Sequence, residues 1–127
     1  MTAAEHLKLA MDMFRGAEAF LDKGDTVQAS EKLYKAVEEA IKALAEHFGL
    51  PEFKEAEAKG RWTTTLLDRA VNRLCDLLKE PQILGWWDTA WYLHVEGFHE
   101  ARLDVDRVKM RLPYVERMLD LARSRIS

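Results

Sequence analysis

The apolar residues of this chain repeat at helical spacing in every long segment between its helix breakers. In the clearest segment the apolar positions follow steps of three and four residues: Tyr34, Val37, Ile41, Leu44 and Phe48. Such spacing gives a helix one apolar face, and no segment shows the alternation expected of a strand. Helices of this kind bury their apolar faces against one another, so the sequence predicts an all-α fold.

Glycine and proline residues divide this pattern into segments. We expect helices over residues 2–23, 25–48, 61 or 63–79, 82–103 and 104–126, with one or two helical turns in the charged connector 50–60. The connection between the first two helices is one or two residues long, which makes these helices antiparallel neighbours. The predicted fold is an antiparallel, up-and-down four-helix bundle with an additional short helix, forming a single domain over residues 1–127.

Pro113 falls inside the last predicted helix. The apolar period continues through this residue without a change of phase. We therefore expect one helix kinked at Pro113, with one lost backbone hydrogen bond, and not two separate helices.

Composition excludes several classes of function. The 127 residues include 19 basic and 22 acidic side chains, a net charge of −3 that gives no strong basic field for nucleic acid. The single Cys75 leaves no intrachain disulfide and fits a reducing compartment. No run of about 18 apolar residues exists, so we expect a cytoplasmic protein without a membrane partner.

The most distinctive stretch, residues 86–100, holds three of the four tryptophans and two of the four histidines. We take its buried stripe from the helical period: Leu84, Trp87, Trp91, His94 and Phe98. Trp86 then points away from this stripe. Trp86, Trp87 and Trp91 together form a candidate packing surface or dimer interface, because aromatic residues outside a small core often lie between subunits.

His94 and His99 are the strongest candidates for a chemical role. They are five residues apart, roughly 140° around an α-helix, and so are not expected to converge. Glu96 and His99 spell one Glu-x-x-His element, whereas di-iron bundles use two, so we predict no metal and no cofactor. The ordinary interpretation is a hydrogen-bonded core residue at His94 and a partly exposed one at His99. Gly97 indicates a close helix crossing or the end of regular helix.

Several motifs resemble the PaREP1 family, known from archaea that live in hot environments. They are Ala29–Ala45, Gly60–Thr64, Trp86–Trp91, Leu93–Leu103 and Arg111–Pro113. The resemblance implies a HEPN-like helical bundle, a superfamily of small dimeric domains. Its members include RNA-cleaving toxins, partners of minimal nucleotidyltransferases and inactive scaffolds. The mixed charges, 32% of the chain, suit a hot environment.

The ribonuclease members of that superfamily carry an arginine, four to six residues, and then a histidine. No arginine stands at that spacing before any histidine of this chain. We therefore predict a homodimeric binding or scaffold module without catalysis. Two alternatives stay open: a metal-independent endoribonuclease, or an antitoxin-like partner of a minimal nucleotidyltransferase. The candidate catalytic residues of the endoribonuclease are His94, His99, Glu96 and Arg102, with RNA as its substrate.

Overall fold

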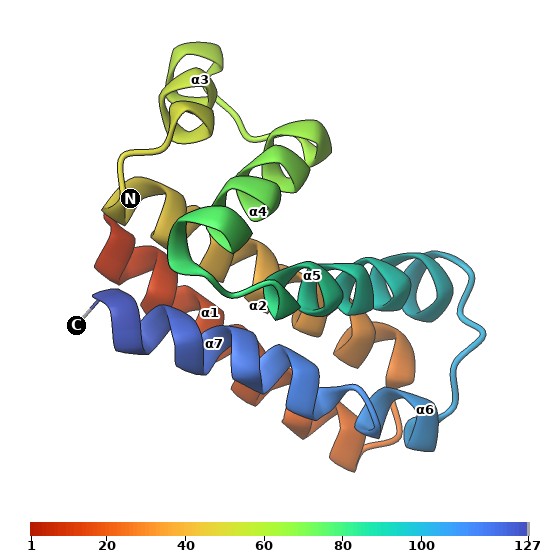
Figure 1. Cartoon of the computed structure of the whole chain (residues 1–127). Helices are drawn as coiled ribbons and strands as arrows, with labels where there is room; N and C mark the ends of the chain where they lie inside the picture. Colours follow the sequence, from red (N-terminus) through yellow and green to blue (C-terminus); the bar gives the residue numbers. More distant parts are fainter. Residues whose placement is uncertain (127) are drawn as a thin grey trace.

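The computed structural model describes residues 1–126, most of which are helical, and has no strand in that range. The elements, in chain order, are α1 (Ala3–Asp22), α2 (Thr26–His47), α3 (Pro51–Lys59), α4 (Thr64–Leu78), α5 (Gln82–Tyr92), the π-helix η1 (Leu93–His99), α6 (Val105–Lys109) and α7 (Leu112–Ile126). Helices α1, α2, α5 and α7 lie side by side, and α4 crosses them with α3 above (Figure 1). The predicted all-α class is confirmed.

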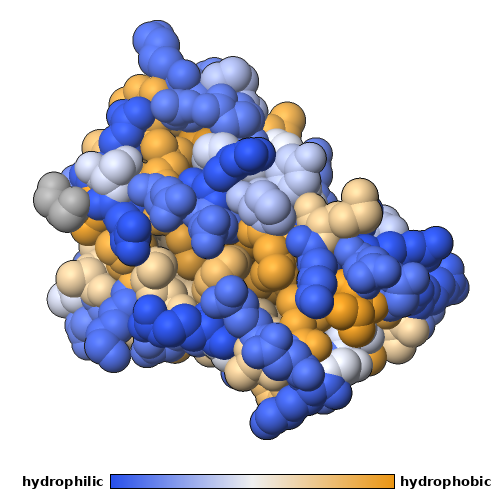
Figure 2. All heavy atoms as spheres, turned by 90° about the horizontal axis from the view of Figure 1, so that it is seen from below, coloured by the Kyte–Doolittle hydropathy of each residue, from blue (hydrophilic) through white to orange (hydrophobic). Residues whose placement is uncertain are grey.

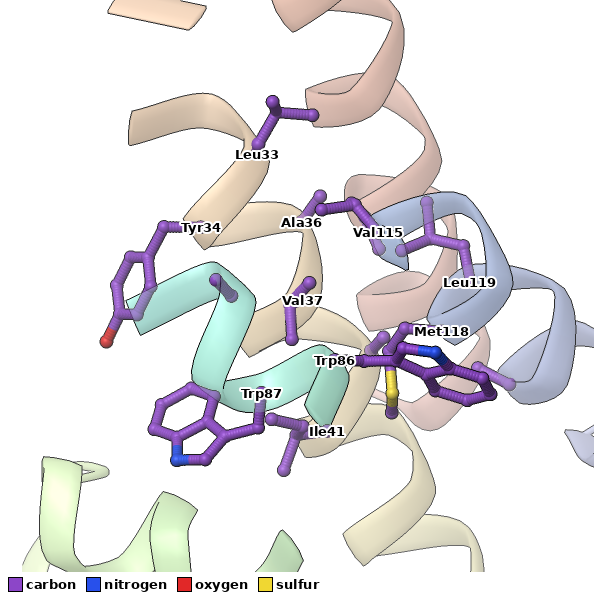
Figure 3. Close-up of a cluster of buried hydrophobic side chains, with 14 of the residues drawn as sticks. Leu33, Tyr34, Ala36, Val37, Ile41, Trp86, Trp87, Val115, Met118 and Leu119 are labelled. Atoms are coloured by element: carbon purple, nitrogen blue, oxygen red, sulfur yellow. The ribbon is translucent and has the colours of Figure 1, made fainter. Parts of the chain in front are cut away.

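Helix α2 is the centre of the core, because it contacts every other helix and η1. Its larger apolar side chains, among them Leu33, Val37 and Ile41, are fully buried. The alanines between them are also buried and keep the helix narrow enough for its neighbours to approach closely. Figure 3 shows these side chains meeting Val115, Met118 and Leu119 of α7 and the two adjacent tryptophans of α5.

Capping side chains begin three helices at positions that the sequence predicted as caps. Asp25 accepts a hydrogen bond from the Gln28 N–H at 3.0 Å, Thr63 from Leu66 at 3.2 Å, and Asp104 from Arg107 at 2.9 Å. Gly60 ends α3 with φ of 75°, a left-handed conformation that glycine adopts without steric cost. The predicted turns in the connector are therefore a helix of nine residues.

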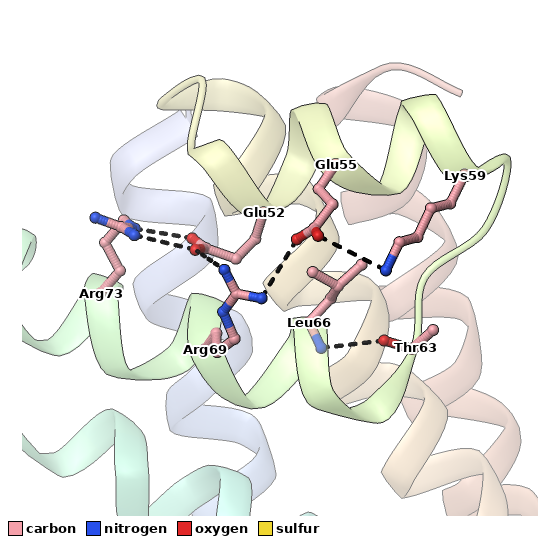
Figure 4. A network of polar contacts seen from close by, with 7 residues as sticks. All are labelled: Glu52, Glu55, Lys59, Thr63, Leu66, Arg69 and Arg73. Atoms are coloured by element: carbon pink, nitrogen blue, oxygen red, sulfur yellow. Dashed lines mark hydrogen bonds and ion pairs between the residues drawn. The ribbon is translucent and has the colours of Figure 1, made fainter.

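A buried carboxylate fixes this short helix on α4. Glu52 is fully buried and accepts hydrogen bonds from Arg73 Nε at 2.8 Å and Nη2 at 3.1 Å (Figure 4). Arg69 and Glu55 extend the network along the same edge. The hydrogen bonds from Arg73 hold the pKa of Glu52 below its ordinary value, against the opposing effect of burial.

The prediction of one kinked helix at the C-terminal end is wrong. Helices α6 and α7 are separate, with Met110 and Arg111 in a turn between them. Pro113 has no N–H to donate to the Lys109 carbonyl, and its ring would collide with that group. The residue instead occupies the first turn of α7, where the missing donor has no cost. The apolar period passes through the break because α6 and α7 both pack on α2.

The predicted helix over residues 82–103 is also corrected. Regular α-helix ends at Tyr92, π-helix continues to His99, and residues 100–104 are not helical. Ala101 has φ of 53°, an uncommon conformation for a residue other than glycine, and it turns the chain away from the helix axis.

No helix within residues 1–126 has the length and apolar character needed to cross a membrane. The face seen from below Figure 1 carries hydrophobic atoms between groups of hydrophilic ones (Figure 2).

Candidate functional site

The buried stripe of α5 and η1 is displaced by one residue from the predicted stripe. Its members each precede a predicted position: Ile83, Trp86, Ala90, Leu93 and Gly97. Trp87 is buried as well, as predicted, whereas Leu84 and Trp91 are exposed. The expectation that Trp86 points away from the core is wrong, since its side chain is 8% exposed and that of Trp91 is 39% exposed.

Both adjacent tryptophans are buried because α5 lies between two other helices. Trp86 points toward Met118 of α7, and Trp87 points to the opposite side (Figure 3). There the Trp87 Nε1–H donates to Asp68 of α4 at 3.1 Å. A helix with neighbours on two sides buries a wider arc than the single stripe that sequence periodicity assumes.

Small residues take the positions at the crossing of η1 and α2. A Cβ atom placed on Gly97 would lie 2.2 Å from Ser30 Oγ and 2.5 Å from Ser30 Cβ. No larger side chain fits at this crossing, so the bulky Trp91 and Phe98 are displaced to its flanks. Both interpretations of Gly97 are confirmed, because it lies at a close crossing and within the π-helical end of the segment.

The π-helix brings His94 and His99 together. Their Nε2 atoms are 3.1 Å apart, within hydrogen-bond distance. A π-helix joins each residue to the fifth residue along, so these two side chains lie on one face of η1. The predicted separation of 140° assumed α-helical geometry and is wrong. Short π-helical segments are frequent at functional sites.

Glu31 of α2 completes a chain of three polar side chains. Its Oε1 lies 2.7 Å from His94 Nδ1, and both side chains are largely buried. With Nδ1–H donating to the carboxylate, His94 Nε2 accepts the hydrogen bond from His99 Nε2–H. His99 is exposed, so the chain runs from a buried carboxylate to the surface. The predicted hydrogen-bonded His94 and partly exposed His99 fit this arrangement.

Sequence reasoning missed Glu31. It lies 63 residues before His94, so no local motif joins them. The one available signal was its position on α2, one helical turn before the seam residue Tyr34. Only a prediction of which helices touch could have paired it with a histidine.

Aromatic rings enclose His94 on the remaining sides. Tyr34 stacks on the imidazole with ring centroids 4.2 Å apart, and the Trp91 centroid is 5.3 Å away. Burial, with the nearby Glu38 and Glu31 carboxylates, raises the pKa of Tyr34 well above its usual range. The Tyr34 hydroxyl therefore stays protonated at neutral pH and does not serve as a base.

Arg102 contacts carboxylates at the end of η1. Its guanidinium lies 3.7 Å from Glu96 Oε2 and 3.4 Å from Glu100 Oε2. These two acidic groups offset part of its charge and would compete with a phosphate for it, although exposed ion pairs of this kind are weak. Within residues 1–126, no group of three or more His, Cys, Asp or Glu side chains is arranged to hold a metal ion.

Two hollows adjoin the exposed side of Trp91. One, of about 310 Å³, lies against α4 and is lined by Asp68, Trp87 and Asp88. The other, of about 290 Å³, lies along η1 and is lined by Tyr92, Val95 and Glu96. Asp88 and Trp91 line both hollows, and we call this area the Trp91 face.

Comparison with known proteins identifies relatives over nearly the whole chain. A crystal structure of a protein from Sulfolobus solfataricus has a TM-score of 0.85 and 41% identity, covering 93% of this chain and 96% of that one. A solution structure of the same target, described as the Orf c02003 protein, has a TM-score of 0.78 and 41% identity, covering 89% of this chain and 87% of that one. Among curated proteins there is no match. The model of the archaeal PaREP1/PaREP8 family matches residues 5–119, and this chain belongs to that family.

Proposed function

We propose that this protein is a homodimeric binding or scaffold module without catalysis, and that its copies meet through the Trp91 face. The observation that carries the proposal is a large aromatic side chain, 39% exposed, between two adjoining hollows. Tryptophan is enriched at the centres of protein interfaces, where it contributes much of the binding energy.

The neighbours of Trp91 support this surface. Leu84, Trp91 and Tyr92 are three of the large apolar residues that remain exposed, and Val95 follows on the same side of the helix. Spacing of seven residues places Leu84 and Trp91 almost in line. A second copy of the same helix would cover this apolar strip from both sides about a two-fold axis.

We further propose an HEPN-like, up-and-down arrangement of α1, α2, α5 with η1, and α7, within a single domain over residues 1–127. The short α1–α2 connection and the contacts among these helices support it. Ser127, the last residue of the predicted domain, lies outside the described residues. The cytoplasmic location and the nucleotidyltransferase partner stay predictions, and co-purification of the two proteins tests the partner.

The dimer is tested by measuring molar mass with light scattering. The wild type is expected at twice the mass of one chain, and Trp91→Ala at the mass of one. The control is Tyr114→Ala, which removes an exposed aromatic side chain of α7 that lies outside the Trp91 face. A monomeric wild type, or a Trp91→Ala variant that stays dimeric, overturns the proposed interface.

A metal-independent endoribonuclease is the second candidate. The 3.1 Å contact of His94 with His99 and the Glu31 carboxylate behind it favour this function, because a carboxylate-oriented imidazole is suited to acid–base chemistry. The pairing of Arg102 with Glu96 and Glu100 opposes it.

Incubation with mixed RNA separates the two functions. The binding module leaves the RNA intact at every protein concentration. The enzyme cleaves it, and His99→Ala abolishes cleavage in a folded protein. The matched control is His47→Ala, which changes an exposed histidine distant in sequence from the chain of three.

A further inference from the structure

A second cavity lies on another side of α5, between that helix and the corner formed by α6 and α7. Its volume is about 580 Å³, within the usual range for sites that bind small molecules. Trp86, Met110 and Tyr114 supply aromatic and apolar wall, and Arg111 and Arg117 supply positive charge. None of the residues that line it is acidic. We call this cavity the arginine groove.

Arg111 is held in place by groups that leave its charge uncompensated. Its Nη1 donates to the Arg107 carbonyl at 2.9 Å, and its guanidinium carbon lies 4.2 Å from the centroid of the Tyr92 ring. The side chain is partly buried, and no carboxylate of residues 1–126 lies within ion-pair distance. A guanidinium has five N–H donors, so most of them remain free to bind a ligand.

Arg117 reaches the groove from the next turns of α7. Its guanidinium carbon lies 5.7 Å from the centroid of the Tyr114 ring, and within residues 1–126 it too pairs with no carboxylate. By contrast, each of three other arginines forms an ion pair with at least one acidic side chain: Arg69, Arg73 and Arg102. In a chain with a net charge of −3, two uncompensated arginines beside one cavity form a local site for an anion.

We propose that the arginine groove binds a small aromatic anion. The negatively charged oxygens contact Arg111 and Arg117, which suit planar, bidentate recognition of carboxylate or phosphate. The flat ring packs against Tyr114 and the accessible edge of Trp86. The groove shares no lining residue with the two hollows of the Trp91 face, although Arg111 contacts Tyr92, which lines one of those hollows.

Phenyl phosphate is a suitable probe because it combines one ring with one dianion. We expect isothermal titration of the full chain to show binding of phenyl phosphate at one site per chain. Inorganic phosphate lacks the ring and phenol lacks the charge, so each is expected to bind at least tenfold more weakly. Added salt weakens the binding of phenyl phosphate, because the attraction is electrostatic.

Variants locate the site. Arg117→Gln and Arg111→Gln are each expected to weaken binding of phenyl phosphate at least tenfold. Arg107→Gln is the control, because its side chain lies outside the groove and only its backbone carbonyl contacts Arg111. Circular dichroism verifies the fold of each variant. If Arg111→Gln does not fold, the affinity of Arg117→Gln for phenyl phosphate decides the test. Absence of binding, equal affinity for inorganic phosphate, or unchanged affinity in Arg117→Gln overturns the proposal.

Discussion

Glu52 and Glu31 both have carboxylates that are largely buried, and they differ in the side chain that each one contacts. Glu52 is fully buried and binds Arg73, whose charge is permanent. Glu31 is largely buried and binds the His94 imidazole at 2.7 Å. The first contact locks α3 on α4. The second contact is linked through His99 to the surface, so it lies within reach of a bound partner.

The two contacts also differ in how many features of the fold must be in place before each can form. Glu52 needs only that α3 and α4 pack, and these helices follow one another in the chain. The Glu31 contact needs α2 and η1 in register, a π-helical turn, and the close approach at Gly97. A structural ion pair therefore tolerates small movements, whereas the histidine chain is sensitive to packing at a single crossing.

Breaking that crossing has the largest expected effect. In Gly97→Ala the new methyl group overlaps Ser30, and we expect a loss of about 3 kcal/mol or more in the free energy of unfolding. Denaturant titration measures the loss. The double variant with Ser30→Gly removes the overlapping atoms and is expected to recover most of it. Unchanged stability of Gly97→Ala contradicts the close crossing.

Removing the permanent ion pair has the next largest effect. Glu52→Gln leaves Arg73 without its counter-ion, and we expect a loss on the order of 2 kcal/mol at pH 7, less than for a pair buried on both sides. The control is Glu57→Gln on the same helix, an exposed position. If Glu52→Gln and Glu57→Gln are equally stable, the structural role assigned to Glu52 is contradicted.

The same pair has a defined pH dependence. The folded-state pKa of Glu52 lies below its unfolded value, because Arg73 donates hydrogen bonds to the carboxylate. Its contribution to stability is therefore complete above the unfolded value of 4.5 and is lost as pH falls through the lower, folded-state pKa. The difference between wild type and Glu52→Gln is expected to shrink over that acidic range.

A third variant, Ser30→Ala, is expected to make the protein more stable. Ser30 Oγ is buried and has no hydrogen-bond partner within residues 1–126. Ser30→Ala keeps the Cβ contact with Gly97 and removes the unpaired hydroxyl, so we expect a gain of about 1 kcal/mol. Thermal unfolding measures it. A loss of stability would mean that the hydroxyl is hydrogen-bonded in solution.

The smallest effect on stability is expected from Glu31→Gln, a decrease of about 0.5–1 kcal/mol, because this substitution weakens a single hydrogen bond. The change should instead be visible in the His94 ring, whose Nδ1–H no longer has a carboxylate acceptor. Nitrogen chemical shifts of the imidazole report the tautomer directly. Glu18→Gln, an exposed change on α1, is the control and should leave those shifts unaltered.

The stretch containing the candidate site shows where sequence reasoning succeeds and where it fails. The helical period correctly predicted helix over most of residues 82–99 and drew attention to Gly97. It chose the wrong face, because it gave the large Trp91 more weight than the small Ala90. At a close crossing the small residue is the one that fits, and size alone does not reveal where crossings lie.

The sequence by itself determined the helical class and many of the helix boundaries. Apolar periodicity, glycine stops and caps such as Asp25, Thr63 and Asp104 act over a few residues, so they can be read locally. Only the tertiary structure decided that α-helix changes to π-helix at Leu93, that His94 meets His99, and that Glu31 lies behind them. These features follow from the fit between α2 and η1, which are distant in the chain, and packing space between distant segments has no local signal.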